Sequence, residues 1–364
     1  MKTDDKKQCG NSMYPLRAPK LRRTGPTITV TTKTTTATSL CCLAVLVLSI
    51  YSVAQAQNNP AQTDRAGWVQ IPGELIRPDC VHEIPNGATV EVHNNHNNDD
   101  DGDRITSDVT LDGAVIAHYD ACPEEAIVTR PHAHSENLGH TPGAGNGWVE
   151  ANRWNVPLGP NHSDNNNDDD DIDYFGGAWT VPSQPSETGA LIYLFNGVES
   201  SIRNFMLQPV LQFGVGPAGG GDYWTVASWL VTSNQAFHSP LQNVYPGNSI
   251  KGYMEMTGIS GSTKSWEVEA KDTTTGADSF LSAHVSGQHW TSAYAGVLEA
   301  YNVVSCAQFP SSGKEVFKGS FVDHGYPLYS SPSPQGWKGS TYPYGGPSCH
   351  FGVVASNGEF VLNL

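Results

Sequence analysis

The segment Leu207-Gln208-Pro209-Val210-Leu211-Gln212-Phe213-Gly214 decides the fold class of this chain. Its apolar and polar side chains alternate with a period of two, which is typical of a β-strand and not of a helix. One face then carries Leu207, Leu211 and Phe213, and the other carries Gln208, Val210 and Gln212. We therefore predict a strand with one face in a hydrophobic core and a second face, bearing Gln212, toward a polar surface.

Short segments of the same kind follow one another from Trp148 to the C-terminus, separated by turn residues. The chain contains 37 Gly and 24 Pro, spread along its length, and no stretch has the period of a long amphipathic helix. This pattern predicts an all-β protein in which residues 147–364 form a β-sandwich of two antiparallel sheets. The expected strands are 178–181, 190–195, 206–213, 223–231, 249–256, 264–271, 293–304 and 351–354.

The N-terminal residues have the pattern of a leader that is removed. Residues 1–40 are rich in Lys and Arg, an apolar run follows from Leu40 to Ala54, and Ala54-Gln55-Ala56 has the small-x-small pattern of a signal-peptidase site. The apolar run is shorter than the ~20 residues of a membrane-spanning helix. We expect a signal peptide over residues 1–56 and a secreted protein without stable membrane insertion; the alternative is a type II signal-anchored protein.

The cysteines agree with export. Four remain after the leader, namely Cys80, Cys122, Cys306 and Cys349, and an even number in an exported chain predicts two disulfides. Of the three connectivities we favour Cys80–Cys122 and Cys306–Cys349, because each bond then closes a loop within one region of the chain. Asn161 begins an Asn-His-Ser glycosylation sequon.

Residues 57–146 differ in composition from the rest. They contain a hairpin pattern, with 109–111 and 114–119 joined by a turn at Asp112-Gly113, then a stretch rich in Pro, Gly and His. We expect a small N-terminal pro-region and linker before the sandwich.

The composition and motifs exclude several functions. The formal net charge of −16 repels nucleic-acid phosphates. The tracts at 97–103 and 168–171 offer oxygen ligands without completing a calcium-loop pattern, and His132, His134 and His140 lie in a Pro/Gly-rich linker without cysteines to complete a zinc site. No Gly-x-Ser-x-Gly or His-Glu-x-x-His motif occurs. We expect no metal and no cofactor.

One carboxylate stands in an apolar strand. Within residues 293–301, Glu299 shares a strand face with Ala295, Val297 and Tyr301. Burial removes the hydration of a charge, so Glu299 needs a partner there, and such residues are enriched at functional sites. Glu299 is therefore a candidate catalytic residue.

An ordered series of short motifs over residues 147–360 resembles the glutamic peptidases of the eqolisin family. The series comprises Gly176-Gly177-Ala178-Trp179, Tyr193-Leu194-Phe195-Asn196-Gly197, Val210-Leu211-Gln212-Phe213-Gly214, Ala227-Ser228-Trp229, Asn248-Ser249-Ile250, Asp272-Thr273-Thr274-Thr275-Gly276 and Ala295-Gly296-Val297-Leu298-Glu299. The resemblance implies a concanavalin-A-like sandwich, or jelly roll, with Glu299 and Gln212 as the catalytic pair. Departures are Asn196 in place of Asp, Ser228 in place of Glu, and Ile192 or Tyr193 in place of Trp.

A peptidase mechanism follows from the resemblance. Glu299 would take a proton from water and return it to the leaving amine, while the Gln212 amide would stabilise the oxyanion. We expect Asn196, Tyr193, Ser228, Trp229 and Gln208 to bind the substrate. The predicted protein is a secreted, monomeric acid endopeptidase that acts on polypeptides.

Two other classes remain open. In the first, Gln212 and Glu299 hydrogen-bond each other inside a non-catalytic sandwich that binds a polysaccharide or cell wall through an aromatic face, supplied by Trp224, Trp229, Trp266, Trp290 and Tyr301. The second is a glycoside hydrolase or lyase, which needs a second carboxylate facing Glu299. The peptidase hypothesis fails if Gln212 and Glu299 lie on opposite faces of their sheet.

Overall fold

A computed structural model describes residues 67–95, 104–123, 127–128, 147–156, 171–324, 336–342, 346–356 and 358–364. These residues belong to one compact unit, which spans 58–364. The predicted signal peptide, the glycosylation sequon at Asn161, the histidine-rich stretch and most of the two acidic tracts lie outside the described residues. Over the described residues, no helix is long and apolar enough to cross a membrane.

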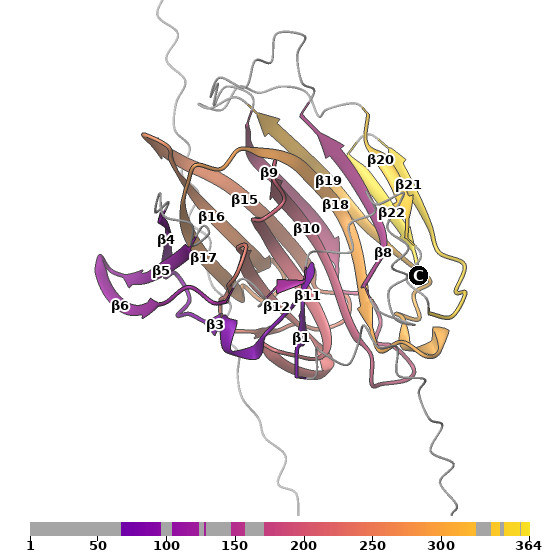
Figure 1. Cartoon of the computed structure of the whole chain (residues 1–364). Helices are drawn as coiled ribbons and strands as arrows, with labels where there is room; N and C mark the ends of the chain where they lie inside the picture. Colours follow the sequence, from indigo (N-terminus) through magenta and orange to yellow (C-terminus); the bar gives the residue numbers. More distant parts are fainter. Residues whose placement is uncertain are drawn as a thin grey trace, which may run out of the picture. The chain divides into compact units, whose positions relative to one another are not determined.

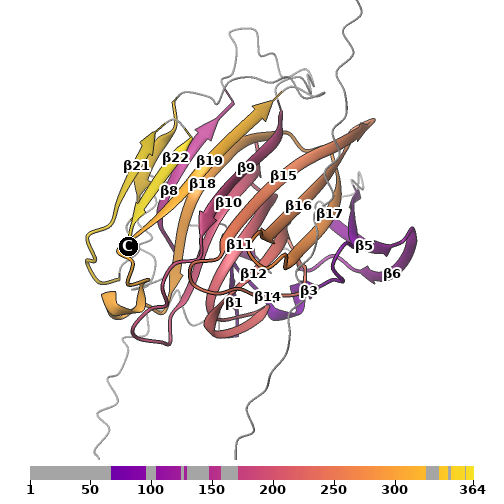
Figure 2. The ribbon, with the colours of Figure 1, turned by 180° about the vertical axis from the view of Figure 1, so that it is seen from behind.

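Two large sheets build the protein, which confirms the predicted all-β sandwich (Figures 1 and 2). The nine-stranded sheet has the order β20-β8-β18-β10-β11-β12-β13-β3, with β14 paired to β12. Its strands are β3 (Val81–Glu83), β8 (Gly147–Asn155), β10 (Leu191–Ser200), β11 (Met206–Gly216), β12 (Gly219–Val231), β13 (Ala236–His238), β14 (Gln242–Asn243), β18 (Trp290–Tyr301) and β20 (Lys338–Thr341).

The ten-stranded sheet has the order β21-β22-β19-β9-β15-β16-β17-β4-β5-β6. Figure 2 shows it from the side opposite to that of Figure 1. Its strands are β4 (Thr89–Asn95), β5 (Arg104–Leu111), β6 (Ala114–Tyr119), β9 (Ile172–Thr180), β15 (Ser249–Ser260), β16 (Thr263–Asp272), β17 (Asp278–Ser286), β19 (Lys314–His324), β21 (Gly352–Ser356) and β22 (Glu359–Asn363). Pairing is antiparallel except where β3 joins β13 and β4 joins β17.

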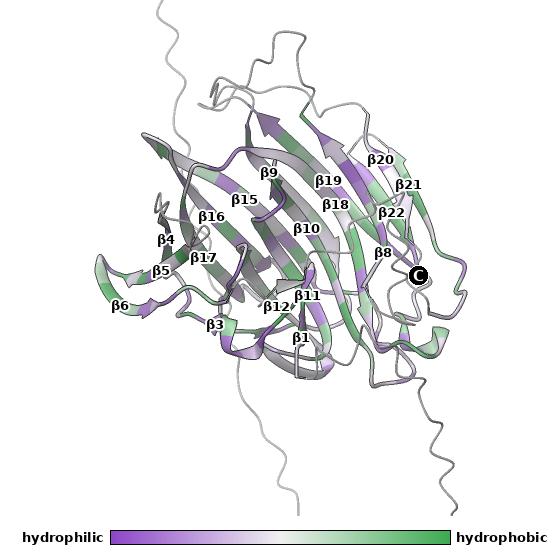
Figure 3. Ribbon diagram, in the orientation of Figure 1, coloured by the Kyte–Doolittle hydropathy of each residue, from purple (hydrophilic) through white to green (hydrophobic). Residues whose placement is uncertain are grey.

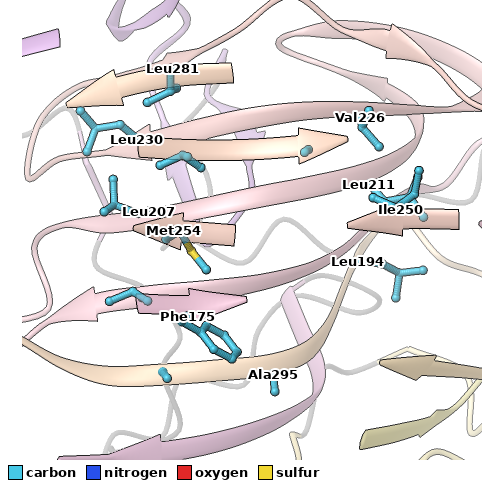
Figure 4. Packing of buried hydrophobic residues seen from close by; sticks show 14 of the residues in the cluster. Phe175, Leu194, Leu207, Leu211, Val226, Leu230, Ile250, Met254, Leu281 and Ala295 are labelled. Carbon is cyan, nitrogen blue, oxygen red and sulfur yellow. The ribbon is translucent and has the colours of Figure 1, made fainter. Parts of the chain in front are cut away.

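The main hydrophobic core lies between the two sheets. It is formed by the side chains that point inward from alternate positions, among them Leu194, Leu211, Phe175 and Ile250 (Figure 4). The same alternation of apolar and polar residues is visible along the strands in Figure 3. Leu207, Leu211 and Phe213 all belong to this core, as the opening segment predicted.

A second hydrophobic cluster lies on the other face of the nine-stranded sheet. It contains Tyr193, Val210 and Tyr301 from the sheet, together with Ile71 and Ile76 from a small N-terminal sheet. That sheet has the order β1-β2-β7, with β1 (Val69–Ile71), β2 (Glu74–Ile76) and β7 (Ile127–Val128). Residues near the N-terminus of the described chain therefore cover the face that bears Gln212.

The residues before 147 are integrated into the sheets. Strand β3 extends the nine-stranded sheet, and β4, β5 and β6 extend the ten-stranded sheet. The expected hairpin around Asp112-Gly113 is present as β5 and β6. Two disulfides, Cys80–Cys122 and Cys306–Cys349, have the connectivity that we favoured.

Candidate active site

Strand register places the two residues of the expected pair on one face. Tyr193 of β10 lies directly opposite Gln212 of β11 and also directly opposite Glu299 of β18. Residues that face each other across neighbouring strands share a face of the sheet. Gln212 and Glu299 therefore meet the same-face condition, with Tyr193 between them and about 10 Å separating the two outer backbones.

Glu299 is fully buried and accepts two hydrogen bonds from described groups. The Tyr301 hydroxyl donates to Oε1, and the backbone N–H of Gly73 donates to Oε2 at 2.7 Å. Burial, and next the charge of Glu299, raise the pKa of Tyr301 and of Tyr193 well above the usual range. Both phenols therefore stay protonated and act as hydrogen-bond donors.

The group that reaches Glu299 belongs to a tight turn. Ile71 pairs with Glu74, so Pro72 and Gly73 form the two-residue loop between β1 and β2. Gly73 has a φ of +95°, and Pro followed by a residue with positive φ is the pattern of a type II turn. The turn places one backbone N–H against the Glu299 carboxylate.

Gln208 holds the other end of the same peptide bond. Its Nε2 donates to the carbonyl oxygen of Pro72 at 2.7 Å. The N–H at the other end of this peptide unit, that of Gly73, donates to Glu299. The Tyr193 hydroxyl donates to the carbonyl oxygen of Gln70 at 3.0 Å. Three side chains of the sheet thus bind three backbone groups of one segment.

Gln212 uses its amide differently. Its Nε2 donates to the carbonyl oxygens of Gly214 at 3.0 Å and Gly219 at 2.8 Å, within the hairpin that joins β11 and β12. A Cβ at Gly220 would lie 2.6 Å from this Nε2, so only glycine leaves room for the amide. Gln212 therefore fixes the hairpin and does not hydrogen-bond Glu299, as one alternative required.

Two of the expected substrate-binding residues face the opposite sheet. The Oδ1 of Asn196 accepts from the Gly296 N–H at 3.0 Å, and a Cβ at Gly177 of β9 would lie 2.8 Å from its Nδ2. The Ser228 hydroxyl donates to the carbonyl oxygen of Ser279 on β17 at 2.8 Å. Asn196 and Ser228 are thus placed between the sheets, away from the Glu299 face.

Trp229 lies on the Glu299 face but at a distance along the sheet. It pairs with Gln208 in register and packs on the His238 ring, with 4.6 Å between the ring centroids. The other aromatic residues considered for a polysaccharide platform are buried: Trp224, Trp266 and Trp290 lie in the core between the sheets. None of these aromatic side chains is exposed in this structure, and Tyr301 is only 3% exposed.

The contribution of the N-terminal turn was not anticipated. The sequence Val69-Gln70-Ile71-Pro72-Gly73-Glu74-Leu75-Ile76 does contain a signal, because a Pro-Gly pair between two apolar triplets indicates a hairpin. That signal predicts the turn and not where it docks. Among the described residues, no group of three or more His, Cys, Asp or Glu side chains is arranged to hold a metal ion.

Comparison with known proteins finds similarity to solved structures only. No family model matches the chain, and no curated protein matches it. The chain is similar to crystal structures of scytalido-glutamic peptidase with a transition-state analogue inhibitor, at 16% identity and a TM-score of 0.39 over 60% of this chain and 98% of that one. It is also similar to SCP-B, a member of the eqolisin family of peptidases in complex with the tripeptide Ala-Ile-His, at 15% identity and a TM-score of 0.37 over the same shares.

Proposed function

We propose that this protein is a secreted, monomeric acid endopeptidase of the glutamic type, with Glu299 as its general base and acid. The observation that carries the proposal is the contact between the Glu299 carboxylate and the N–H of Gly73 at 2.7 Å. The nitrogen of a peptide bond is the atom that must receive a proton when the bond breaks. This contact supports a role in which Glu299 first takes a proton from water and then passes it to that nitrogen.

The reaction needs only water and the side chains of this sheet. The Glu299 carboxylate removes one proton from a water molecule, and the water oxygen bonds to the carbonyl carbon of the substrate. A glutamine amide of β11 donates to the oxyanion that forms on the carbonyl oxygen. The carbon–nitrogen bond then breaks, and the proton held by Glu299 passes to the nitrogen, leaving a carboxylic acid and an amine.

The contacts of the N-terminal residues support a precursor form in which the Pro72–Gly73 turn occupies the site around Glu299. We propose that residues 57–146 act as a pro-region, in which the β1–β2 hairpin over residues 69–76 covers Glu299. Because β3 to β6 are paired into the two large sheets, only this hairpin has to leave for a substrate to enter. The Cys80–Cys122 disulfide keeps the rest of the region in place when it does.

The test follows the chain from residue 57 at about pH 4, near the intrinsic pKa of a glutamate. Mass spectrometry follows the N-terminal region, and a denatured protein serves as added substrate. We expect cleavage by the wild type and a loss of roughly 10²–10⁴-fold in Glu299→Gln, the usual contribution of a general base. Glu150→Gln is the matched control, because Glu150 is another buried glutamate of the nine-stranded sheet and its nearest backbone partners are on β21 and β22.

Three results would count against this proposal. One is a wild type that cleaves neither itself nor the added protein at any acid pH. Another is equal activity in Glu299→Gln and wild type. A wild type that fails to cleave but sediments with insoluble polysaccharide would favour the binding module instead.

A further inference from the structure

We infer that Gln208, and not Gln212, is the glutamine that works with Glu299, and that the two side chains bind the opposite ends of a single peptide bond. This inference rests on the proposed function and names the amide that the mechanism requires. It also defines the ligand class of the site, which is the backbone of a polypeptide in any sequence.

The first argument is the bond that both residues hold. The carbonyl oxygen of Pro72 and the N–H of Gly73 belong to one peptide unit, and each lies 2.7 Å from its partner, Gln208 Nε2 or Glu299 Oε2. This unit is the centre of a two-residue turn, so neither group takes part in the β1–β2 ladder. Buried backbone groups need partners, and the sheet supplies one donor and one acceptor at the spacing of a peptide bond.

The second argument is the state of the competing amide. A glutamine NH₂ group has two hydrogens to donate. Gln212 donates them to the carbonyl oxygens of Gly214 and Gly219. To reach an oxyanion, Gln212 would have to break both bonds and open the hairpin. Gln208 makes only the bond to Pro72 among the described contacts, which leaves it a second N–H for the charge that develops on the oxygen.

The third argument is the kind of atom that is recognised. Tyr193, Gln208 and Glu299 bind the carbonyl oxygen of Gln70, the carbonyl oxygen of Pro72 and the N–H of Gly73. All three partners are main-chain atoms. A site that binds the main chain through fixed side chains accepts many sequences, which suits an endopeptidase that degrades unfolded protein.

The Pro72–Gly73 unit occupies this site without being an extended substrate. Val69 pairs with Ile76 across the turn, so the chain reverses direction at the very bond that is held. Peptides bind most favourably to sheet-like sites as extended strands. A substrate must therefore displace the turn, after which its own peptide bond takes the place of Pro72–Gly73 between Gln208 and Glu299.

The test compares Gln208→Leu with Gln212→Leu in the chain from residue 57. With denatured protein or a fluorogenic peptide at pH 4, we expect kcat of Gln208→Leu to fall by roughly 10²–10³-fold, as on removal of one oxyanion donor, with a smaller change in KM. Gln212→Leu is expected to lower the melting temperature, because two hairpin bonds are lost, and to lower kcat by less than tenfold.

A second measurement does not depend on activity. Hydrogen–deuterium exchange of the fragment that contains Gly73 reports on the hydrogen bonds that Gln208 and Glu299 make to the Pro72–Gly73 peptide unit. We expect its exchange to accelerate at least tenfold in both Gln208→Leu and Glu299→Leu, which remove the two side-chain partners of the Pro72–Gly73 peptide unit, and to stay near the wild-type rate in Gln212→Leu, because the Gln212 amide donates to the β11–β12 hairpin.

The outcomes separate the two proposals. If Gln212→Leu loses kcat by 10²-fold or more while Gln208→Leu stays near wild type, the inference is wrong and the role of Glu299 stands. If the wild type has no activity, the proposed function fails, and the catalytic role of Gln208 fails with it. Unchanged exchange at Gly73 in both Gln208→Leu and Glu299→Leu would refute the proposal that these two side chains bind the Pro72–Gly73 peptide unit.

Discussion

The pH dependence of folding stability gives a sharp test of how carboxyl groups are buried here. Glu150 of β8 is completely buried, and among the described residues its carboxyl oxygens make no hydrogen bond of normal geometry. Burial raises its pKa to about 8, and the backbone N–H groups of Gly352 and Asn363 offset this only in part. Its ordinary value in an unfolded chain is 4.5, so the folded protein retains a proton that the unfolded chain releases.

The sign and size follow from proton linkage. The contribution of Glu150 to stability is complete below pH 4.5 and is lost as the pH rises toward 8, because only the folded state holds the proton in that interval. The loss is about 1.4 kcal/mol per pH unit, which amounts to about 2.5 kcal/mol between pH 5.5 and pH 7.5. Glu150 alone therefore makes the protein more stable at pH 5.5 than at pH 7.5.

Glu150→Gln isolates this contribution from those of other groups. His82 acts in the opposite direction, since burial lowers its pKa to about 4 and it favours the folded state as the pH rises toward 6.5. Its effect is present in both proteins and cancels in their difference. We expect the wild type to lose about 2.5 kcal/mol more than Glu150→Gln between pH 5.5 and pH 7.5.

The assay is urea unfolding followed by tryptophan fluorescence, with the disulfides intact, at pH 5.5, 6.5 and 7.5. Two proteins with parallel stability profiles over this range would refute the reasoning, because Glu150 would then be ionised in the folded state. Glu315→Gln provides an independent repeat, since burial also raises the pKa of Glu315 to about 8.

Three further predictions concern stability, and each is measured by chemical unfolding. The double variant Cys306→Ser/Cys349→Ser opens a loop with a sequence separation of 43 and should cost about 4 kcal/mol; no loss would contradict it. Lys264→Met leaves the buried Asp171 carboxylate without the Lys264 ammonium, with His289 as its remaining ion-pair partner, and should cost about 3–5 kcal/mol, most of it recovered on adding Asp171→Leu. Gly214→Ala places a Cβ 2.2 Å from a backbone carbonyl oxygen at a φ of +98° and should cost about 4 kcal/mol or more; near-wild-type stability would show that the hairpin can shift.

Strands with large inward side chains were predictable from sequence, and others were not. The expected segment 206–213 lies within β11, and 264–271 lies within β16. Strand β17 was missed although every second side chain is buried, because Ser279 and Ala283 occupy inward positions and weaken the hydrophobic period. Strand β19 was missed because register shifts between Lys318 and Phe321 break its period.

The face of each candidate residue was predictable only when its strand was regular. Period-two alternation placed Gln208 and Gln212 on one face, and the register agrees. Asn196 was expected at the substrate, yet the same alternation along β10 places it on the core face with Leu194, opposite to Tyr193, and its side chain meets Gly177 of the opposite sheet. The irregular position is on β18, where an extra residue at Gly296 interrupts the pairing with β10. Ala295, expected on the Glu299 face, therefore packs in the core between the sheets, whereas Val297 lies on the Glu299 face.

The choice between Gln208 and Gln212 lies beyond sequence patterns altogether. Both are glutamines on the same face of one strand, four positions apart, and the resemblance of short motifs selects Gln212. What distinguishes them is the partner that tertiary folding brings to each. The glycine-rich hairpin folds back on Gln212, whereas the Pro72–Gly73 turn, 136 residues away in sequence, docks on Gln208. An amide whose two hydrogens are already bound within its own hairpin has none left for a substrate, so hydrogen-bond accounting, rather than position in a motif, is the ground on which we propose Gln208 as the partner of Glu299.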